Sequence, residues 1–421
     1  MKRMMRVAAA VLGLGIAAAQ AETQVVLQYP YPDLFNLTHK QIEEAFAKSN
    51  PGIKVTFRAP YQDYEDATQR VLREAVTGTV PDITFQGLNR VRVIADKGIA
   101  VPLDKFIAAE RDFEAAGFHK AMFDAGRVNG NVHGLPFAIS LPIVYYNLDL
   151  VKRAGGNPDQ LPTTWDGVIA LAKKIDGLTP DIHGIVVEWS ITGNWLWQAM
   201  VFANGGTMMN EPETRVAFDG EAGKAAIRTL ARLATEAKAP NLSGIDMRTA
   251  FAAGKAGILV TTTAYLNALN RQIDSKFTLK THTFPGLTEG VSRLPAGGNV
   301  AIITARTPEK QKAAWEVLKF WTGPEGATVM VKTTGYMAPN NRVANFDLKD
   351  FYAENPNQYT AVRLLPYLTG WYAFPGSNGL KITDVLKDHL QSIMDGTRAN
   401  ESEKVLSNMA SDVQALLPKT N

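Results

Sequence analysis

Short apolar segments alternate with amphipathic segments along the first hundred residues of the chain. Runs rich in valine, isoleucine and aromatic residues predict strands, and apolar residues at helical spacing predict helices between them. The predicted order is strand 25–29, helix 38–49, strand 53–57, helix 64–77 and strand 83–85. Thr38 and Gln41 have the spacing of a capping box at the start of the first helix. This βαβαβ order predicts a mostly parallel sheet that is covered by helices on both faces.

The segment 134–146 does not fit this alternation. It is a long, extended apolar stretch that Pro136 and Pro142 interrupt. Because proline is rare in central strands, the segment is better suited to crossing between two lobes than to the interior of one. A second crossing is expected at the glycine-marked segment 295–298. The remaining pattern predicts helices at 165–175, 195–204, 220–238 and 308–321, and strands at 184–188, 257–260 and 300–304.

The N-terminus has the three parts of a secretory signal peptide. Lys2, Arg3 and Arg6 precede an apolar run, which ends at a triplet of small residues closed by Ala21. The run is too short to remain in a bilayer, so we expect cleavage after Ala21 and release into the periplasm. The 421 residues include no cysteine, which excludes a disulfide framework and a lipid anchor on a cysteine after the cleavage site.

Charge and length restrict what the exported chain can be. Removal of the three N-terminal basic residues from the total of 44 leaves 41, which equals the number of acidic residues. A formally neutral chain without a basic patch is not expected to bind nucleic acid. No second apolar run reaches the length of a membrane span, and roughly 400 residues exceed the size of one hydrophobic core. We therefore expect a globular protein with two lobes.

A search for catalytic motifs returns none. The sequence lacks a phosphate-binding loop, a nucleophile elbow and the HExxH motif of zinc proteases. The histidines are scattered without metal-ligand spacing, and acidic pairs such as Glu43-Glu44 fall on helix faces expected to be solvated. We expect no enzyme activity, no cofactor and no metal.

Aromatic residues beside small polar residues are the distinctive chemistry of this chain. Trp189-Ser190, the segment 193–197, Gly335-Tyr336 and the segment 370–372 share this arrangement. The apolar face of a sugar ring stacks on indole or phenol, while its hydroxyl groups need hydrogen-bond partners. A single tryptophan such as Trp195 is explained equally well as a core residue of its own helix. The recurrence of the arrangement favours a carbohydrate-like ligand.

Several longer motifs occur in a recognisable order and spacing. They are NPGIKV at 50–55, PDI at 81–83, LPFAISLPIVYYNLDLVKRAGG at 135–156 with LPTTWDGV after it, GGNVAIITARTPEKQKAAWEVLKFWTGPEGA at 297–327 and TGYMAPNNRV at 334–343. With these motifs the chain resembles the extracellular solute-binding proteins of ABC importers that take up sugars. The likeness is greatest to the glycerol-3-phosphate-binding branch, including its FYxxNP-like stretch at 351–356. It covers nearly the whole chain after the signal peptide.

The resemblance implies a two-lobed α/β fold of the type II periplasmic binding proteins, with the ligand in the cleft between the lobes. Each lobe is expected to hold a mostly parallel sheet flanked by helices. Three chain crossings are expected, near 138–141, 296–298 and 322–324. The first lobe then comprises 22–138 and 299–322, and the second comprises 139–298 and 323–421.

The resemblance also implies a set of ligand-binding positions. They are Tyr64, Gln86, Ser140, Trp195, Thr263, Gly298 as a backbone donor, Tyr336 and Lys381. Gln86 stands where the glycerol-3-phosphate branch has glutamate, and Lys381 stands where it has arginine. Arginine holds phosphate through a planar fork of two hydrogen bonds, whereas lysine is a point charge. The ligand therefore stays open between a neutral sugar, a polyol and a phosphorylated or sulfonated sugar.

The sequence as a whole predicts a monomeric periplasmic protein that captures a small carbohydrate-like solute and delivers it to the permease subunits of an ABC importer. A ligand that touches both lobes would stabilise their closed arrangement. Two alternatives stay open. A secreted polysaccharide-active enzyme would need two carboxylates that converge in the aromatic cleft. A ligand-sensing module for a chemoreceptor would need an exposed docking face.

Overall fold

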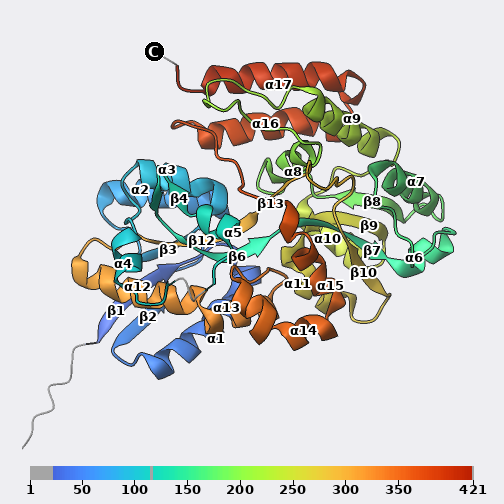
Figure 1. The fold of residues 1–421 in the computed structure, drawn as a ribbon. Coiled ribbons are helices and arrows are strands. Elements are labelled where there is room, and N and C mark those ends of the chain that lie inside the picture. The colour runs from blue at the N-terminus through green and yellow to red at the C-terminus, as the bar shows by residue number, and fades with distance from the viewer. Residues whose placement is uncertain (1–21, 114–116, 420–421) are drawn as a thin grey trace, which may run out of the picture.

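Two mixed sheets with helices packed around them make up the computed structural model, which describes residues 22–113 and 117–419 (Figure 1). The expected signal peptide and its cleavage site lie outside the described residues. Within the described part of the chain, no helix combines the length and the apolar character that a membrane span requires.

The first sheet has five strands in the order β2-β1-β3-β12-β6. Their bounds are β1 Thr23–Gln28, β2 Ile53–Phe57, β3 Ile83–Gly87, β6 Leu135–Ser140 and β12 Gly297–Ile303. β1 runs parallel to β2 and to β3, so the βαβαβ order predicted for the start of the chain is confirmed. β12 runs antiparallel to both β3 and β6, because the chain enters it on its return from the second sheet.

The second sheet has four strands in the order β10-β7-β9-β8. Their bounds are β7 Pro142–Asn147, β8 His183–Val187, β9 Ala256–Thr262 and β10 Leu279–His282. Among these strands β8 and β9 are parallel, whereas β7 runs against both β9 and β10. The expectation of a mostly parallel sheet in each lobe is therefore wrong for this lobe, and in the first sheet only two of the four pairings are parallel.

The chain passes between the first sheet and the second lobe at two short links. Leu141 alone separates β6 from β7, and Ala296 separates β12 from the short strand β11 Leu294–Pro295. We propose that the crossings expected near 138–141 and 296–298 lie at these links. Gly298 has a φ of 111°, and a Cβ there would lie 1.9 Å from the carbonyl oxygen of Ala138. Only glycine fits this close approach of two strands.

Helix α13 Pro324–Thr333 lies on the side of the first sheet. It packs against α1 Pro32–Ser49 and α12 Pro308–Thr322, and the hydroxyl oxygens of Thr38 and Thr333 are 2.7 Å apart. Residues 323–333 were expected in the second lobe. We therefore propose that the third crossing comes after Thr333 rather than at 322–324.

Helix α1 begins earlier than the sequence pattern suggested. Tyr31 is its N-cap with a left-handed φ of 55°, and Pro32 occupies the first helical turn. Proline suits that position because its fixed φ is helical and its missing N–H would have no partner there. Thr38 lies inside the helix and is buried, so the expected capping box with Gln41 does not exist.

The other helices surround the two sheets, and α8, α9, α16 and α17 pack together beside the second one (Figure 1). Their bounds are α2 Tyr64–Thr77, α3 Val91–Asp96, α4 Asp104–Ala109, α5 Lys120–Asp124, α6 Leu148–Arg153, α7 Trp165–Asp176, α8 Trp195–Ala203, α9 Glu221–Thr235, α10 Gly244–Ala252, α11 Leu266–Ile273, α14 Lys349–Glu354, α15 Pro356–Arg363, α16 Gly379–Met394 and α17 Ser402–Leu416. Short strands complete the fold at β4 Arg127–Val128, β5 Asn131–Val132 and β13 Leu368–Thr369. The turn η1 Leu88–Arg90 joins β3 to α3.

Candidate functional site: a closed cleft between the sheets

A small cavity lies between the two lobes, next to the links that connect them. Residues from both sides of the links line it, among them Tyr64 at the start of α2 and Trp195 at the start of α8. Its free volume is about 30 Å³, which is room for one or two water molecules. Ligand pockets commonly measure about 300–1,000 Å³. The structure therefore shows the cleft closed, and a sugar would enter only with the lobes further apart.

Most of the positions implied by the family resemblance meet in this cavity. They are Tyr64, Ser140, Trp195, Gly298 and Tyr336. Ser140 is the last residue of β6 and Gly298 the second of β12, so both stand beside the links between the sheets. The N-cap Asp63 accepts a hydrogen bond from the backbone N–H of Asp66 and thereby fixes the start of α2, where Tyr64 lies.

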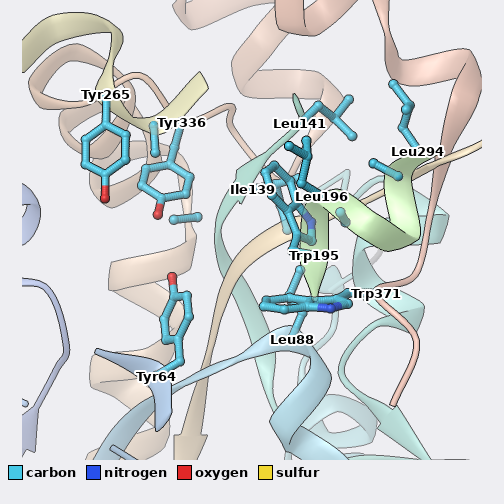
Figure 2. Packing of buried hydrophobic residues seen from close by; sticks show 14 of the residues in the cluster. Tyr64, Leu88, Ile139, Leu141, Trp195, Leu196, Tyr265, Leu294, Tyr336 and Trp371 are labelled. Carbon is cyan, nitrogen blue, oxygen red and sulfur yellow. The ribbon is translucent and has the colours of Figure 1, made fainter. Parts of the chain in front are cut away.

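Tyrosine hydroxyl groups supply the polar chemistry of the cleft. The hydroxyls of Tyr64 and Tyr336 face each other (Figure 2). Asn299 donates its side-chain N–H to the Tyr64 oxygen at 3.2 Å. Burial raises the pKa of Tyr64 to about 12 and raises that of Tyr336 as well. Both phenols are therefore neutral near pH 7 and can donate as well as accept hydrogen bonds.

Two tryptophans form the apolar part of the cleft. The rings of Trp195 and Trp371 are tilted by 59° with their centroids 6.4 Å apart (Figure 2). Each indole N–H already has a partner, the Pro295 carbonyl at 3.1 Å for Trp195 and the Asn194 side chain at 3.3 Å for Trp371. The indoles therefore offer a ligand their faces rather than their N–H groups. A Cβ at Gly297 would lie 2.8 Å from the Trp195 ring, so that glycine makes room for the indole.

The cavity also contains tyrosines that the sequence reasoning missed, Tyr31 and Tyr265. The guanidinium of Arg248 lies 3.8 Å from the centre of the Tyr265 ring and pairs with the buried Glu188. Thr261 also donates a hydrogen bond to Glu188, so this buried network holds Tyr265 in place. Tyr31 follows the carboxyl end of β1, and ligands of open α/β sheets bind at such ends. That placement was the available signal for Tyr31.

Three expected positions do not line the cavity. Gln86 is fully buried, accepts a hydrogen bond from Thr68 at 3.0 Å and donates one to Thr84 at 2.8 Å. Its amide is therefore occupied inside the first lobe. The N–H of Thr263 donates to the Leu141 carbonyl at 3.0 Å, which ties this residue to the link between the sheets. Lys381 is exposed on α16.

The described residues that line the cavity carry no acidic or basic side chain. The carboxylate pair that a glycosidase needs is thus not among them. Nor do the described residues bring together three or more side chains of the kinds that bind metal ions. What the cavity offers is neutral hydrogen-bonding groups and aromatic faces.

Comparison with known sequences finds binding proteins of bacteria. A family model for bacterial extracellular solute-binding proteins matches residues 41–361. A putative binding protein of Brucella abortus is 25% identical over 394 residues, which cover 90% of each chain. The sn-glycerol-3-phosphate-binding periplasmic protein UgpB of Escherichia coli is 23% identical over 415 residues, with 93% of this chain and 92% of that chain covered.

Solved structures share the fold. An ABC substrate-binding protein of Listeria monocytogenes, in complex with cycloalternan, has a TM-score of 0.81 at 19% identity, covering 94% of this chain and 99% of that one. UgpB of Mycobacterium tuberculosis, in complex with glycerophosphocholine, has a TM-score of 0.80 at 18% identity, covering 92% and 97%. These likenesses confirm the two-lobed α/β fold class.

Proposed function

The chain belongs to the bacterial extracellular solute-binding proteins, and from this premise we propose that its own ligand is a small, neutral carbohydrate or polyol. The observation that carries the proposal is the cavity itself, in which Tyr64, Tyr336, Trp195 and Trp371 come together between the lobes. Phenol and serine hydroxyls suit the rim of a sugar ring, and the indole faces suit its C–H surface.

The charge of the cleft supports a neutral ligand over a phosphorylated one. Phosphate sites in proteins commonly use arginine or lysine, because charge-assisted hydrogen bonds are the strong ones. No lysine or arginine is among the described residues that line this cavity, and Lys381 lies outside it. The Escherichia coli relative is named for glycerol-3-phosphate. Its ligand is therefore not carried over to this chain.

The mechanism that we propose is capture and release without chemical change. A ligand between the lobes touches residues of both, so it stabilises the closed arrangement over any open one. The closed protein would present its solute to the permease of an ABC importer. We propose that the chain acts as a monomer in the periplasm, exported by its N-terminal segment and released after Ala21, without a lipid anchor.

A ligand screen on purified protein tests the proposal. The protein is unfolded and refolded to remove bound solute, and its thermal midpoint is measured with neutral monosaccharides, disaccharides, polyols and their phosphates. A true ligand raises the midpoint in a saturable way, because it binds only the folded state. We expect a neutral carbohydrate to do so and to be recovered unaltered after prolonged incubation. A response confined to phosphorylated compounds, or conversion of the sugar to a product, would contradict the proposal.

A further inference from the structure

A second, larger cavity adjoins the cleft and shares Trp371 with it. This cavity, which we call the groove, has a volume of about 610 Å³, whereas the cleft has about 30 Å³. Its size falls within the range of ligand pockets. Trp371 lines both cavities, so a single indole stands between them. In Figure 2, Leu88 of the groove lies next to Trp371, on the side away from Trp195.

Both lobes contribute to the groove. Leu88 and Arg92 come from the turn and helix after β3, on the first lobe. Phe202 comes from the end of α8, and Tyr372 from the loop after β13, on the second lobe. A ligand in the groove would therefore touch both lobes, as a ligand in the cleft would.

Three basic and three acidic side chains line the groove, and Arg92 with Glu213 and Arg127 with Asp124 form two ion pairs among them. Arg92 donates to both carboxylate oxygens of Glu213, at 3.2 and 3.0 Å, and Tyr372 donates its hydroxyl to the same carboxylate at 2.7 Å. Arg127 lies 3.3 Å from Asp124. These pairs do not select a charged ligand. They do offer donors and acceptors side by side, which is what the hydroxyl groups of a sugar require.

Aromatic and sulfur-containing side chains provide the apolar surface beside these pairs. Trp371, Tyr372, Phe202 and Met209 all line the groove. The groove shares aromatic faces with the cleft and adds ion-paired polar groups that are not among the described residues lining the cleft. The groove fits a sugar ring better than a lipid chain, because a lipid chain has no groups that hydrogen-bond with polar side chains.

We propose that the groove is a second sugar subsite, and that the solute of this protein therefore contains at least two linked rings. One ring would lie in the cleft and the next in the groove, with the indole of Trp371 between them. The inference rests on the proposed function, because it presupposes that the cleft binds a carbohydrate.

Blocking the groove tests the inference. Thr207 is exposed and lines the groove but not the cleft, so Thr207→Trp would fill the groove and leave the cleft untouched. Ala373→Phe fills it from a different loop, in case the first variant folds poorly. Val76→Trp is the control, because Val76 is 88% exposed on α2 and lines neither cavity.

Each form is purified from the periplasm of its own host, and native mass spectrometry measures the mass and occupancy of the small molecule that stays bound. We expect the wild type and Val76→Trp to retain a molecule of at least two linked rings. Its occupancy should fall at least tenfold in the two groove variants, whose folding is checked by circular dichroism.

Two results would overturn the inference while leaving the proposed function intact. One is a single-ring solute in the wild type. The other is a longer solute held equally well by the wild type and the folded groove variants. Failure of the wild type to retain any carbohydrate, together with no response in the sugar screen, would instead overturn the proposed function and the inference with it.

Discussion

At the scale of single residues, the cleft recognises its solute with neutral groups. Tyr64 and Tyr336 are kept uncharged by burial, and Tyr64 accepts a hydrogen bond from Asn299. Ser140 is 3% exposed at the end of β6 and lines the same cavity. Because none of these groups carries a charge, the affinity has to come from several modest hydrogen bonds and from stacking. Each neutral hydrogen bond contributes about 0.5–1.5 kcal/mol.

Ser140→Ala tests this view of the hydrogen bonds. Loss of one neutral hydrogen bond should weaken binding of the screened sugar by about 0.5–1.5 kcal/mol, or roughly two- to tenfold. Titration calorimetry measures the dissociation constant. The matched control is Ser411→Ala, at an exposed position of α17. Equal affinity of the two variants would remove Ser140 from the site.

Lys381 and Gln86 provide a contrasting pair of predictions. Lys381→Met should leave the dissociation constant within twofold of the wild-type value, because the side chain is exposed outside the cleft. Gln86→Ala should instead lower the free energy of unfolding by about 1–3 kcal/mol, since it removes two buried hydrogen bonds, one from Thr68 and one to Thr84. Calorimetry and urea unfolding measure the two effects. A tenfold loss of affinity in Lys381→Met would restore the case for an anionic ligand.

The sequence motifs indicated where much of the site lies along the chain. They did not indicate which way each side chain points. Ser140, Gly298 and Tyr336 lie within motifs that carry the family resemblance, and that resemblance implied their place in the cleft. Gln86 stands in a strand, where a side chain faces one side or the other, and it faces the hydroxyls of the first lobe. The exposure of Lys381 depends on how α16 is rotated, which tertiary packing decides.

At the scale of elements, a buried histidine joins helices α1 and α12. His39 Nδ1 accepts a hydrogen bond from the indole N–H of Trp321 at 3.0 Å, and its ring stacks on Phe137 with centroids 5.3 Å apart. Burial lowers the pKa of His39 to about 3. The imidazole is therefore neutral in the folded protein, and its protonation is coupled to unfolding.

The stability of the protein should fall as the pH drops below about 6.5. The pKa of His39 is lower in the folded state, at about 3, than in the unfolded state, at about 6.5, so the unfolded state binds the proton first. The stability conferred by the neutral ring is fully present above pH 6.5. It decreases by about 2 kcal/mol between pH 7 and pH 5.

His39→Gln isolates this contribution, because glutamine can still accept the indole hydrogen bond and does not titrate. Urea unfolding at pH 7 and pH 5 should show a drop about 2 kcal/mol smaller in the variant than in the wild type. Burial also lowers the pKa of His119 and of His282, and both remain in the variant. An identical drop in both proteins would mean that His39 does not carry the effect.

The elements themselves could largely be predicted from the sequence, whereas the direction of the later strands could not. Hydrophobic periodicity reports the local conformation, and β2 and α2 have the bounds that it indicated. The antiparallel pairings of β7 and β12 follow from where the chain crosses between the sheets. The path of the whole chain determines where these crossings occur, and a local sequence pattern does not report it.

At the scale of the whole molecule, polar contacts across the lobes accompany closure. Arg92 of α3 pairs with Glu213, and Arg90 donates to the Thr383 hydroxyl on α16 at 3.3 Å. The side chains of Arg92 and Glu213 are 31% and 34% exposed. Ion pairs of this kind contribute about 0–1 kcal/mol and are screened by salt. They stabilise the closed arrangement slightly, and ligand binding has to supply the remaining free energy of closure.

Glu213→Gln should therefore weaken ligand binding by no more than about fivefold, and the difference from wild type should shrink at high salt. Calorimetric titrations at low and high ionic strength measure both effects. Glu221→Gln is the control, because Glu221 forms an exposed ion pair with Lys224 within α9. A much larger loss in Glu213→Gln would mean that this contact, rather than the ligand, determines closure.

We expect a neutral carbohydrate to bring the two lobes together around it. A distance measured between the lobes tests this expectation most directly. Because the chain has no cysteine, Val76→Cys on α2 and Ile245→Cys on α10 place one spin label on each lobe at exposed positions. Pulsed electron paramagnetic resonance measures the separation of the labels before and after saturation with the sugar. We predict a broad distribution of longer distances without sugar and a narrow, shorter one with it. An unchanged distribution at saturation would contradict the account.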